Sequence, residues 1–507
     1  MNLLTPLRRA VTIGAARPAV VGDDGVRTYA DMAERVGRLG AALATPLGTA
    51  PGDRVAIVAA NCAEYLEIYQ AVPGFGRVLV PLNARHTVPE LEYALRDAGA
   101  TVLFTDLDPT PFEAIVPTVV TLPTGYEALL GDATAAEPPH VAETDLAGLF
   151  YTGGTTGAAK GVMLTHHNLI ANAFHLMATW PFTPDTRWAV IAPLFHAAGS
   201  FAVLATVWAG GSHAVLPRFD PAAALDLMDE HSVTHTLVVP TMLAAMADEQ
   251  LARPRRLDRF THVSYGGSPS ATEVLRRAHQ AFPNVSMLHL YGTTETAPIA
   301  TALPGNERVL DTELARSCGQ AVVGIELQVV NPQNQAVGPG EVGDVCVRGD
   351  NVMAGYWHKP VETAAVLRDG WYHTGDLGYV DAEGHLFLVD RAKDMIVTGG
   401  ENVYGTEVED ALYRHPAVVE AAVYGVPDST WGEAVMASVV VRTLVSTNDL
   451  TQHCRALIAG YKVPKRWDLR EVDAPLPKSG AGKILKRELR APHWEGLDGS
   501  IGGATPS

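Results

Sequence analysis

Cysteine is scarce in this chain of 507 residues, and its four copies are widely scattered. Cys62, Cys318, Cys346 and Cys454 form no CxxC pair and no cluster with histidine, so neither a disulfide framework nor a zinc site is expected. The first nine residues carry no apolar segment after their charges. We therefore expect no secretory signal and a cytoplasmic protein.

Positive charge is also in deficit. The chain has 38 Lys and Arg against 56 Asp and Glu, which gives a formal net charge of −18. Such a composition does not favour non-specific binding to nucleic acid, and no nucleic-acid partner is expected. A few local basic side chains can still bind an anionic small molecule inside an acidic protein.

A long uninterrupted hydrophobic run is missing as well. Residues 189–211 contain no Asp, Glu, Lys or Arg and are long enough to span a bilayer. Proline, histidine, serine and glycine interrupt this stretch, which favours a buried strand, a turn and a buried helix. We therefore expect no transmembrane segment.

The chain does contain short β-branched runs that alternate with helical stretches, as is typical of doubly wound α/β layers. The length alone favours two to four structural units. We expect two α/β subdomains, at about residues 1–145 and 146–310, and a helix at residues 63–72. The expected strands are residues 54–60, 78–81, 101–105 and 234–239.

The pattern changes near Gly319. Segments 325–330 and 344–348 are separated by Asn-Pro and Gly-Pro-Gly turns, which indicates short antiparallel strands to about residue 390. A further α/β unit is expected from about 394 to 490, followed by a glycine-rich tail.

A loop rich in glycine and threonine provides the first candidate site. Residues 151–161 read Tyr-Thr-Gly-Gly-Thr-Thr-Gly-Ala-Ala-Lys-Gly, after an expected strand at 146–150 and before a helix near Thr165. Glycine lets backbone N–H groups converge on an anion, and Lys160 adds positive charge. Gly161 follows Lys160, so the loop is not a Walker A motif. A flexible surface loop is the alternative.

This loop resembles the phosphate loop of the adenylate-forming superfamily, which includes acyl-CoA synthetases, peptide-synthetase adenylation domains and beetle luciferases. That family usually has Ser where this chain has Gly153 and Pro where it has Ala159. The first change removes a hydroxyl donor, and the second frees backbone that ATP must order. The resemblance implies that ATP binds at Thr152, Gly153, Gly154, Thr155, Thr156, Gly157 and Lys160.

Further segments resemble family motifs in the expected order. Residues 193–199 resemble the segment whose histidine, here His196, borders the acyl pocket. Residues 265–268 resemble the stretch beside adenine and the acyl group, which implies nucleotide contacts at Gly266, Gly267 and Ser268. A hydrogen-bonded core histidine and a simple turn are the respective alternatives.

The segment Tyr291-Gly-Thr-Thr-Glu-Thr296 is more specific. A tyrosine ring can stack on adenine, threonine hydroxyls can contact phosphate, and a carboxylate can hold magnesium. A helix N-cap at one of the threonines is compatible with these roles. The resemblance implies ATP contacts at Tyr291, Gly292 and Thr293, an α-phosphate contact at Thr294 and a Mg²⁺ ligand at Glu295.

Two more segments supply candidate ribose contacts. Residues 372–378 contain Asp376, whose carboxylate can accept hydrogen bonds from both ribose hydroxyls. Residues 390–394 contain Arg391, which the resemblance implies as the second ribose contact, and Lys393 at the hinge position of the family. An ordinary turn and a solvated charge run are the alternatives.

The last two segments lie near the C-terminus. Residues 399–409 resemble the segment that builds the pantetheine channel, which implies coenzyme A contacts at Gly399, Gly400 and Glu401. Gly405 and Thr406 replace the usual Pro-Ala of the family. Residues 477–487 place Lys483 on a glycine-rich loop, where one ammonium can reach between a carboxylate and the α-phosphate.

The chain is thus identified as a member of the adenylate-forming superfamily over nearly its whole length. Membership implies an α/β fold with a large N-terminal domain and a smaller, mobile α+β C-terminal domain. The N-terminal domain would combine the two doubly wound subdomains with a small β-barrel. The implied bounds are 1–391, with the barrel at 311–391, a hinge at 392–394, the C-terminal domain at 395–491 and a flexible tail at 492–507.

The implied reaction joins an acid to a thiol with ATP, Mg²⁺ and coenzyme A, through an acyl-adenylate. Rotation at the hinge would then exchange Lys483 for the 399–404 face. The implied catalytic residues are His196, Thr294, Glu295 and Lys483.

Three alternatives remain open. The acyl group could pass to the thiol of a separate carrier protein, the adenylate could be oxidised, or the chain could be an inactive nucleotide-binding scaffold. Glu295, Asp376, Arg391 and Lys483 argue against the scaffold. A homodimer is compatible with the sequence.

The acid is expected to be a monocarboxylic fatty or aromatic acid, because no basic residue stands out as the partner of a second carboxylate. The residues expected to line an apolar cavity are Phe201, Trp208, Val238, Val239 and Met242.

Overall fold

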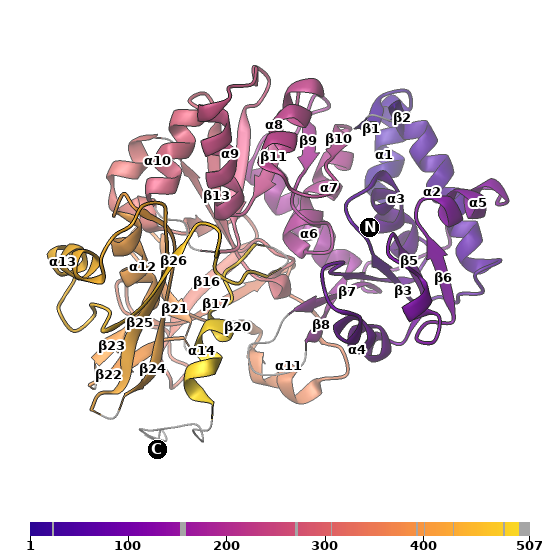
Figure 1. Ribbon diagram of the computed structural model, residues 1–507. Helices are drawn as coiled ribbons and strands as arrows, with labels where there is room; N and C mark the ends of the chain where they lie inside the picture. Colours follow the sequence, from indigo (N-terminus) through magenta and orange to yellow (C-terminus); the bar gives the residue numbers. More distant parts are fainter. Residues whose placement is uncertain are drawn as a thin grey trace.

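Four β-sheets organise the described part of the molecule, three in the first 391 residues and one in the C-terminal part (Figure 1). The computed structural model describes residues 1–22, 25–152, 159–268, 272–305, 307–391, 394–399, 401–428, 430–479 and 482–495.

The first sheet has seven strands in the order β18-β8-β7-β4-β3-β5-β6, and its inner strands are parallel. Parallel strands covered on both faces need apolar residues throughout, and β4 is buried at every position. The strands are β3 (Arg54–Val58), β4 (Val78–Leu82), β5 (Ala100–Thr105), β6 (Thr118–Thr121), β7 (Leu146–Thr152), β8 (Lys160–Thr165) and β18 (Gly355–Tyr356). The nearby helices are α2 (Tyr29–Ala44), α3 (Ala63–Gly74), α4 (Val88–Ala98) and α5 (Thr124–Gly131).

The second sheet has nine strands in the order β15-β14-β13-β12-β11-β9-β10-β1-β2. The strands from β13 to β1 run parallel, and antiparallel strands close both edges. The strands are β1 (Pro18–Gly22), β2 (Gly25–Thr28), β9 (Arg187–Val190), β10 (Ser212–Val215), β11 (His235–Val238), β12 (His262–Gly266), β13 (Ser286–Tyr291), β14 (Thr301–Gly305) and β15 (Gln320–Ala321). The associated helices are α1 (Thr5–Gly14), α6 (His166–Thr179), α7 (Ala197–Ala209), α8 (Pro221–Glu230), α9 (Pro240–Ala252) and α10 (Thr272–Ala281).

The expected strands and the helix at 63–72 are confirmed, but the division at residue 145 does not follow the sheets. β7 and β8, from the second expected subdomain, pair within the first sheet, whereas β1 and β2 pair within the second. Sheet membership depends on long-range pairing, which the order of elements along the chain does not determine.

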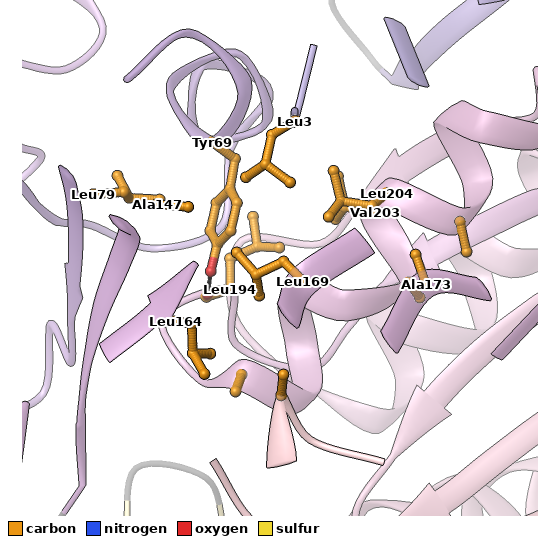
Figure 2. Packing of buried hydrophobic residues seen from close by; sticks show 14 of the residues in the cluster. Leu3, Tyr69, Leu79, Ala147, Leu164, Leu169, Ala173, Leu194, Val203 and Leu204 are labelled. Carbon is orange, nitrogen blue, oxygen red and sulfur yellow. Dashed lines mark hydrogen bonds between the residues drawn. The ribbon is translucent and has the colours of Figure 1, made fainter. Parts of the chain in front are cut away.

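One hydrophobic core joins the two sheets (Figure 2). Tyr69 of α3, Leu169 of α6 and Val203 of α7 are all buried in it. The Tyr69 hydroxyl donates a hydrogen bond to the Leu194 carbonyl oxygen at 3.4 Å, so the first layer is tied to the segment that follows β9. Because they share a core, the two α/β layers are fixed relative to each other.

Residues 189–211 form the end of β9, a turn and the apolar helix α7, as expected. In the described part of the chain, no helix combines the length and the apolar character needed to cross a bilayer.

The third sheet is antiparallel, as the pattern after Gly319 predicts. Where a small barrel was expected, the described strands pair as an open five-stranded sheet in the order β16-β17-β20-β19, with β21 beside β20. The elements are β16 (Ile325–Val330), β17 (Gly343–Gly349), α11 (Pro360–Val366), β19 (Leu367–Arg368), β20 (Trp371–Val380) and β21 (Leu386–Arg391).

The C-terminal part has its own mixed sheet in the order β23-β22-β25-β24, with β26 parallel to β25, and its own core. α14 continues to Trp494, so residues 492–494 are helical, although the tail was expected to begin at 492. The elements are β22 (Ile396–Thr398), β23 (Glu401–Val403), α12 (Gly405–Tyr413), β24 (Val418–Asp428), β25 (Gly432–Val441), α13 (Thr447–Leu457), β26 (Arg466–Glu471) and α14 (Lys486–Trp494).

Candidate functional site

The candidate site lies at one edge of the nine-stranded sheet. β9, β11, β12 and β13 are parallel, so their carboxyl ends meet at the same edge. In open α/β sheets this edge is where ligands bind. Segments 193–199, 239–241, 266–268 and 291–296 all follow these strand ends and therefore converge there.

His196 is the N-cap residue of α7, and its Nδ1 atom accepts a hydrogen bond from the Ala198 N–H at 3.1 Å. Burial, and then the positive charge of Lys483, lower the pKa of His196 to about 4. The imidazole is therefore neutral at pH 7.

The Lys483 loop docks on the start of α9. The Thr241 hydroxyl donates a hydrogen bond to the Gly482 carbonyl oxygen at 3.4 Å, and a Cβ added at Gly482 would lie 3.1 Å from the Val239 side chain. Lys483 itself is exposed, and its N–H donates to the Ser479 hydroxyl at 3.2 Å. The loop thus presents Lys483 at the carboxyl edge of the sheet.

Tyr291 and Asp376 meet across two sheets. The buried Tyr291 hydroxyl donates to Asp376 Oδ2 at 2.9 Å. Burial, and then the Asp376 carboxylate, raise the pKa of Tyr291, so this hydroxyl stays protonated. Arg391 is the cross-strand partner of Asp376 on β21, which puts the two expected ribose contacts side by side, although the Arg391 side chain lies outside the described part.

Glu295 sits in a short 3-10 helix, Thr294–Thr296, for which Thr293 is the N-cap residue. The Tyr356 hydroxyl donates to Glu295 Oε1 at 2.8 Å, and the Thr293 hydroxyl donates to the Tyr372 hydroxyl at 3.4 Å. This position is compatible with both roles expected for the threonines, the helix N-cap and the phosphate contact.

Lys160 approaches the same place from β8. Its ammonium lies 5.0 Å from the centroid of the Tyr356 ring, and the Tyr356 hydroxyl holds Glu295. Thr152 and Lys160 are cross-strand partners at the ends of β7 and β8. The remaining phosphate-loop candidates lie outside the described residues: Gly153, Gly154, Thr155, Thr156 and Gly157.

Two glycines at this edge are required by close backbone approach. A Cβ on Gly266 would lie 2.1 Å from the Leu290 carbonyl oxygen, and one on Gly292 would lie 1.8 Å from the Pro298 carbonyl oxygen. Gly267 has φ +80°, and Ser268 beside it is partly buried. Side chains are therefore excluded where the sequence predicts that nucleotide and acid approach the backbone.

Two of the predicted coenzyme A contacts, Gly399 and Glu401, are not brought to this edge. Gly399 has φ +61°, and its N–H donates to the Trp431 carbonyl oxygen at 2.8 Å, while Glu401 is exposed on β23. Figure 1 shows β22 and β23 at the left edge, away from the nine-stranded sheet. Gly400 and Lys393 lie outside the described residues.

The expected lining of the acid pocket is only partly at this place. Val238 and Met242 are buried in the core beneath α9, and Trp208 packs edge-on against Phe174 at 4.9 Å. Val239 touches the Lys483 loop, whereas the Phe201 side chain lies outside the described part.

Two groups of side chains in the described part have metal-ligand spacing away from Glu295: Asp344, Cys346 and His373, and Asp381, Glu383 and His385. In the first group His373 Nδ1 lies 2.7 Å from Asp344 Oδ2 and 3.2 Å from Cys346 Sγ. Burial raises the pKa of the Cys346 thiol to about 12, and hydrogen bonds link its side chain and that of Asp344 to His373. In the second group the Asp381 carboxylate accepts hydrogen bonds from the backbone of the other two residues.

The Glu295 carboxylate offers the hard oxygen ligands that Mg²⁺ prefers, and its hydrogen-bond partner Tyr356 lies against Lys160 at one end of the phosphate loop. Tyr356 and Tyr372 were not expected beside Glu295. Tyr372 is the first residue of the 372–378 segment and could have been noticed, whereas Tyr356 lies 61 residues from Glu295 with no local signal.

Two family models match the chain. The model described as AMP-binding enzyme matches residues 7–357, and the model described as AMP-binding enzyme C-terminal domain matches residues 407–483. The chain is 40% identical to a feruloyl-CoA synthase of an Amycolatopsis species over 494 residues, which cover 96% of this chain and 97% of the relative. It is 36% identical to a fatty acid–[acyl-carrier-protein] ligase of Streptomyces coeruleorubidus over 491 residues, covering 94% and 93%.

A solved structure gives the same result. ATP-bound MatB from Rhodopseudomonas palustris matches with a TM-score of 0.88 at 32% identity, over 98% of this chain and 99% of that one. Apo MatB matches with a TM-score of 0.77 at 32% identity, over 97% and 99%. The ATP-bound form is thus the better structural match of the two. The chain belongs to the AMP-binding enzyme family of the adenylate-forming superfamily, and it is an ATP-dependent acyl-CoA synthetase that uses Mg²⁺ and coenzyme A and works through an acyl-AMP intermediate.

Proposed function

We propose that the acid is an aromatic monocarboxylic acid of the hydroxycinnamate type. The observation that carries this proposal is the 40% identity to a feruloyl-CoA synthase over 96% of the chain. The neutral state of His196 supports a single carboxylate, because this histidine supplies no charge for a second one. Val239 adds an apolar side chain beside Gly267 at this edge, which suits an apolar ring better than a second charged group.

In the first half-reaction, ATP would lie against Thr152 and Lys160, with its adenine beside Tyr291 and its ribose at Asp376 and Arg391. A carboxylate oxygen of the acid attacks the α-phosphorus, the bond to the bridging oxygen breaks, and pyrophosphate leaves. Lys483 would stabilise the negative charge that develops on the α-phosphate. Bound Mg²⁺ neutralises phosphate charge, and Glu295 would hold it.

The docked Lys483 loop supports the assignment of this arrangement to adenylation, since Gly482 of the loop accepts a hydrogen bond from Thr241 while β23, which carries Glu401, lies away from the nine-stranded sheet (Figure 1). In the second half-reaction the C-terminal domain would rotate about Lys393 and bring Gly399, Gly400 and Glu401 to the site. The thiol sulfur then attacks the acyl carbon, AMP leaves with the carboxylate oxygen, and the thiol proton is released.

A fatty acid, delivered to coenzyme A or to a carrier protein, is the second candidate. The 36% identity to a fatty acid–[acyl-carrier-protein] ligase favours it, again over nearly the whole chain.

Pyrophosphate release separates these candidates. The full-length protein is assayed with ferulate, benzoate, octanoate, palmitate and malonate, each with coenzyme A, with a pantetheinylated carrier protein, or with neither. We expect kcat/KM for ferulate with coenzyme A to exceed that for octanoate by at least about tenfold, the value of one or two kcal/mol in pocket fit. A preference for octanoate or palmitate, with coenzyme A or with the carrier protein, would instead establish the second candidate.

A further inference from the structure

We propose that Asp344 is a positioning residue for the nucleotide site, because it holds the β-bulge at residues 374–376 of β20, which carries Asp376. This inference rests on the proposed role of Asp376 as the ribose contact. Asp344 lies on β17, a strand on which no nucleotide-binding or catalytic residue was expected.

The pairing between β17 and β20 is irregular at this bulge. Asp344 pairs with Leu377 and Cys346 pairs with His373, so only residue 345 of β17 stands opposite residues 374–376 of β20. Such a bulge re-aims a side chain, and bulges are common beside active sites. Gly375, at the centre of the bulge, has φ +70°, a conformation that favours glycine.

Both oxygens of the Asp344 carboxylate brace the bulge. Oδ2 lies 2.7 Å from Nδ1 of His373, the residue immediately before the bulge, and Oδ1 accepts a hydrogen bond from the Gly375 N–H at 3.1 Å. Hydrogen bonds to a charged acceptor are about twice as strong as neutral ones. One carboxylate therefore fixes both the entry and the centre of the bulge.

The remaining contacts pass this geometry on to Asp376. The Thr374 hydroxyl donates to the Val345 carbonyl oxygen at 2.8 Å and accepts from the Asp376 N–H at 3.0 Å. On the far side the Asp376 carboxylate accepts from the Tyr291 hydroxyl. If the bulge relaxes, Asp376 moves relative to Tyr291, and its contact with ribose hydroxyls weakens.

The test compares ATP with 2′-deoxy-ATP as the nucleotide for the full-length enzyme. Asp344→Asn keeps the shape and loses the charge and one acceptor. We expect the KM for ATP to rise about fivefold and the preference for ATP over 2′-deoxy-ATP to fall by a similar factor, as loss of one charge-assisted hydrogen bond predicts. The KM for the acid and the melting temperature should change little, whereas a merely structural defect would change both.

Glu326→Gln is the matched control. Glu326 lies on the neighbouring strand β16 of the same sheet and binds Arg348 of β17 at 2.9 Å, on an exposed face away from the bulge. It should leave the nucleotide preference unchanged. Should Asp344→Asn fail to fold, His373→Phe removes the second partner of the same clamp and should lower the preference in the same direction.

Asp376→Asn separates the two claims. If it leaves the preference for ATP over 2′-deoxy-ATP intact, the proposed ribose contact is wrong. If it abolishes the preference while folded Asp344→Asn, or folded His373→Phe in its place, retains the parent value within twofold, the ribose contact stands and the clamp is overturned.

Discussion

Lys483 is the residue at which the two half-reactions should separate. Its loop is docked at Thr241, and burial followed by the Lys483 charge lowers the pKa of His196, so we assign the Lys483 ammonium to the proposed adenylation step. Lys483→Ala should slow acyl-AMP formation by about 10²–10³-fold, as removal of one charge-stabilising donor does. Thioester formation from supplied acyl-AMP should be spared, which single-turnover assays of each half-reaction measure.

Lys478→Ala is the control for that prediction, because Lys478 forms an ion pair with Glu420 of its own domain. It should retain both half-reactions. Equal damage to both steps by Lys483→Ala would remove the assigned role.

The residue scale also shows what local sequence can predict. Four candidate residues stand in short motifs whose chemistry can be predicted without knowing the fold: Tyr291, Glu295, Asp376 and Lys483. Tyr356 has no such motif, and only the pairing of β18 with β8 brings it to Glu295.

At the scale of elements, the segment after β13 depends on a glycine. Gly292→Ala would place a methyl group 1.8 Å from the Pro298 carbonyl oxygen, so the loop that carries Glu295 must move. We expect a loss of about 1–3 kcal/mol in the free energy of unfolding and at least a tenfold loss of adenylation. Urea unfolding and pyrophosphate release measure the two effects.

Gly305→Ala is the comparison variant. Gly305 lies on β14, the partner strand of β13, and an added Cβ would be 3.7 Å from its nearest neighbour. It should be close to neutral, and a Gly292→Ala enzyme with parental activity would contradict the close-approach argument.

Element boundaries were mostly predictable, whereas sheet membership was not. The β-branched run at β3 and the helical stretch at α3, which is buried on all sides, are local patterns, and both predict their element. β1 and β7 look equally strand-like, yet each joins the sheet that the other half of the chain dominates.

At the scale of the whole molecule, catalysis should require rotation at Lys393. Lys393→Pro fixes φ and should hold one arrangement, so steady-state turnover should fall at least tenfold while one half-reaction survives. Lys393→Ala removes the charge but leaves the backbone free, and it should turn over nearly normally. Stopped-flow traces in which the proline variant matches the parent in both steps would contradict the hinge.

Acid should destabilise the whole fold. His166 and His213 are fully buried, and burial lowers the pKa of each to about 4, against about 6.5 when unfolded. Between pH 6.5 and 4 the unfolded chain binds protons that the native state does not, so stability is lost as pH falls through this window. Each group contributes up to about 3 kcal/mol, and the loss is complete only below pH 4.

Urea unfolding at pH 7, 6 and 5 checks this expectation. His213→Gln keeps a donor for the Ala19 carbonyl oxygen, which lies 3.1 Å from His213 Nδ1, and it should flatten the pH dependence. An unchanged slope would show that His213 does not drive the effect.

The short motifs predict the chemistry without any knowledge of the fold, because phosphate, ribose and carboxylate contacts need particular residue types at short spacing. Which of these motifs meet in space depends on the folded molecule. Tyr291 reaches Asp376 across 85 residues, and Gly482 reaches Thr241 across 241, through pairings between sheets and domains. Such contacts depend on which sheet each strand joins, and on the arrangement of the C-terminal domain, and no local pattern carries that information.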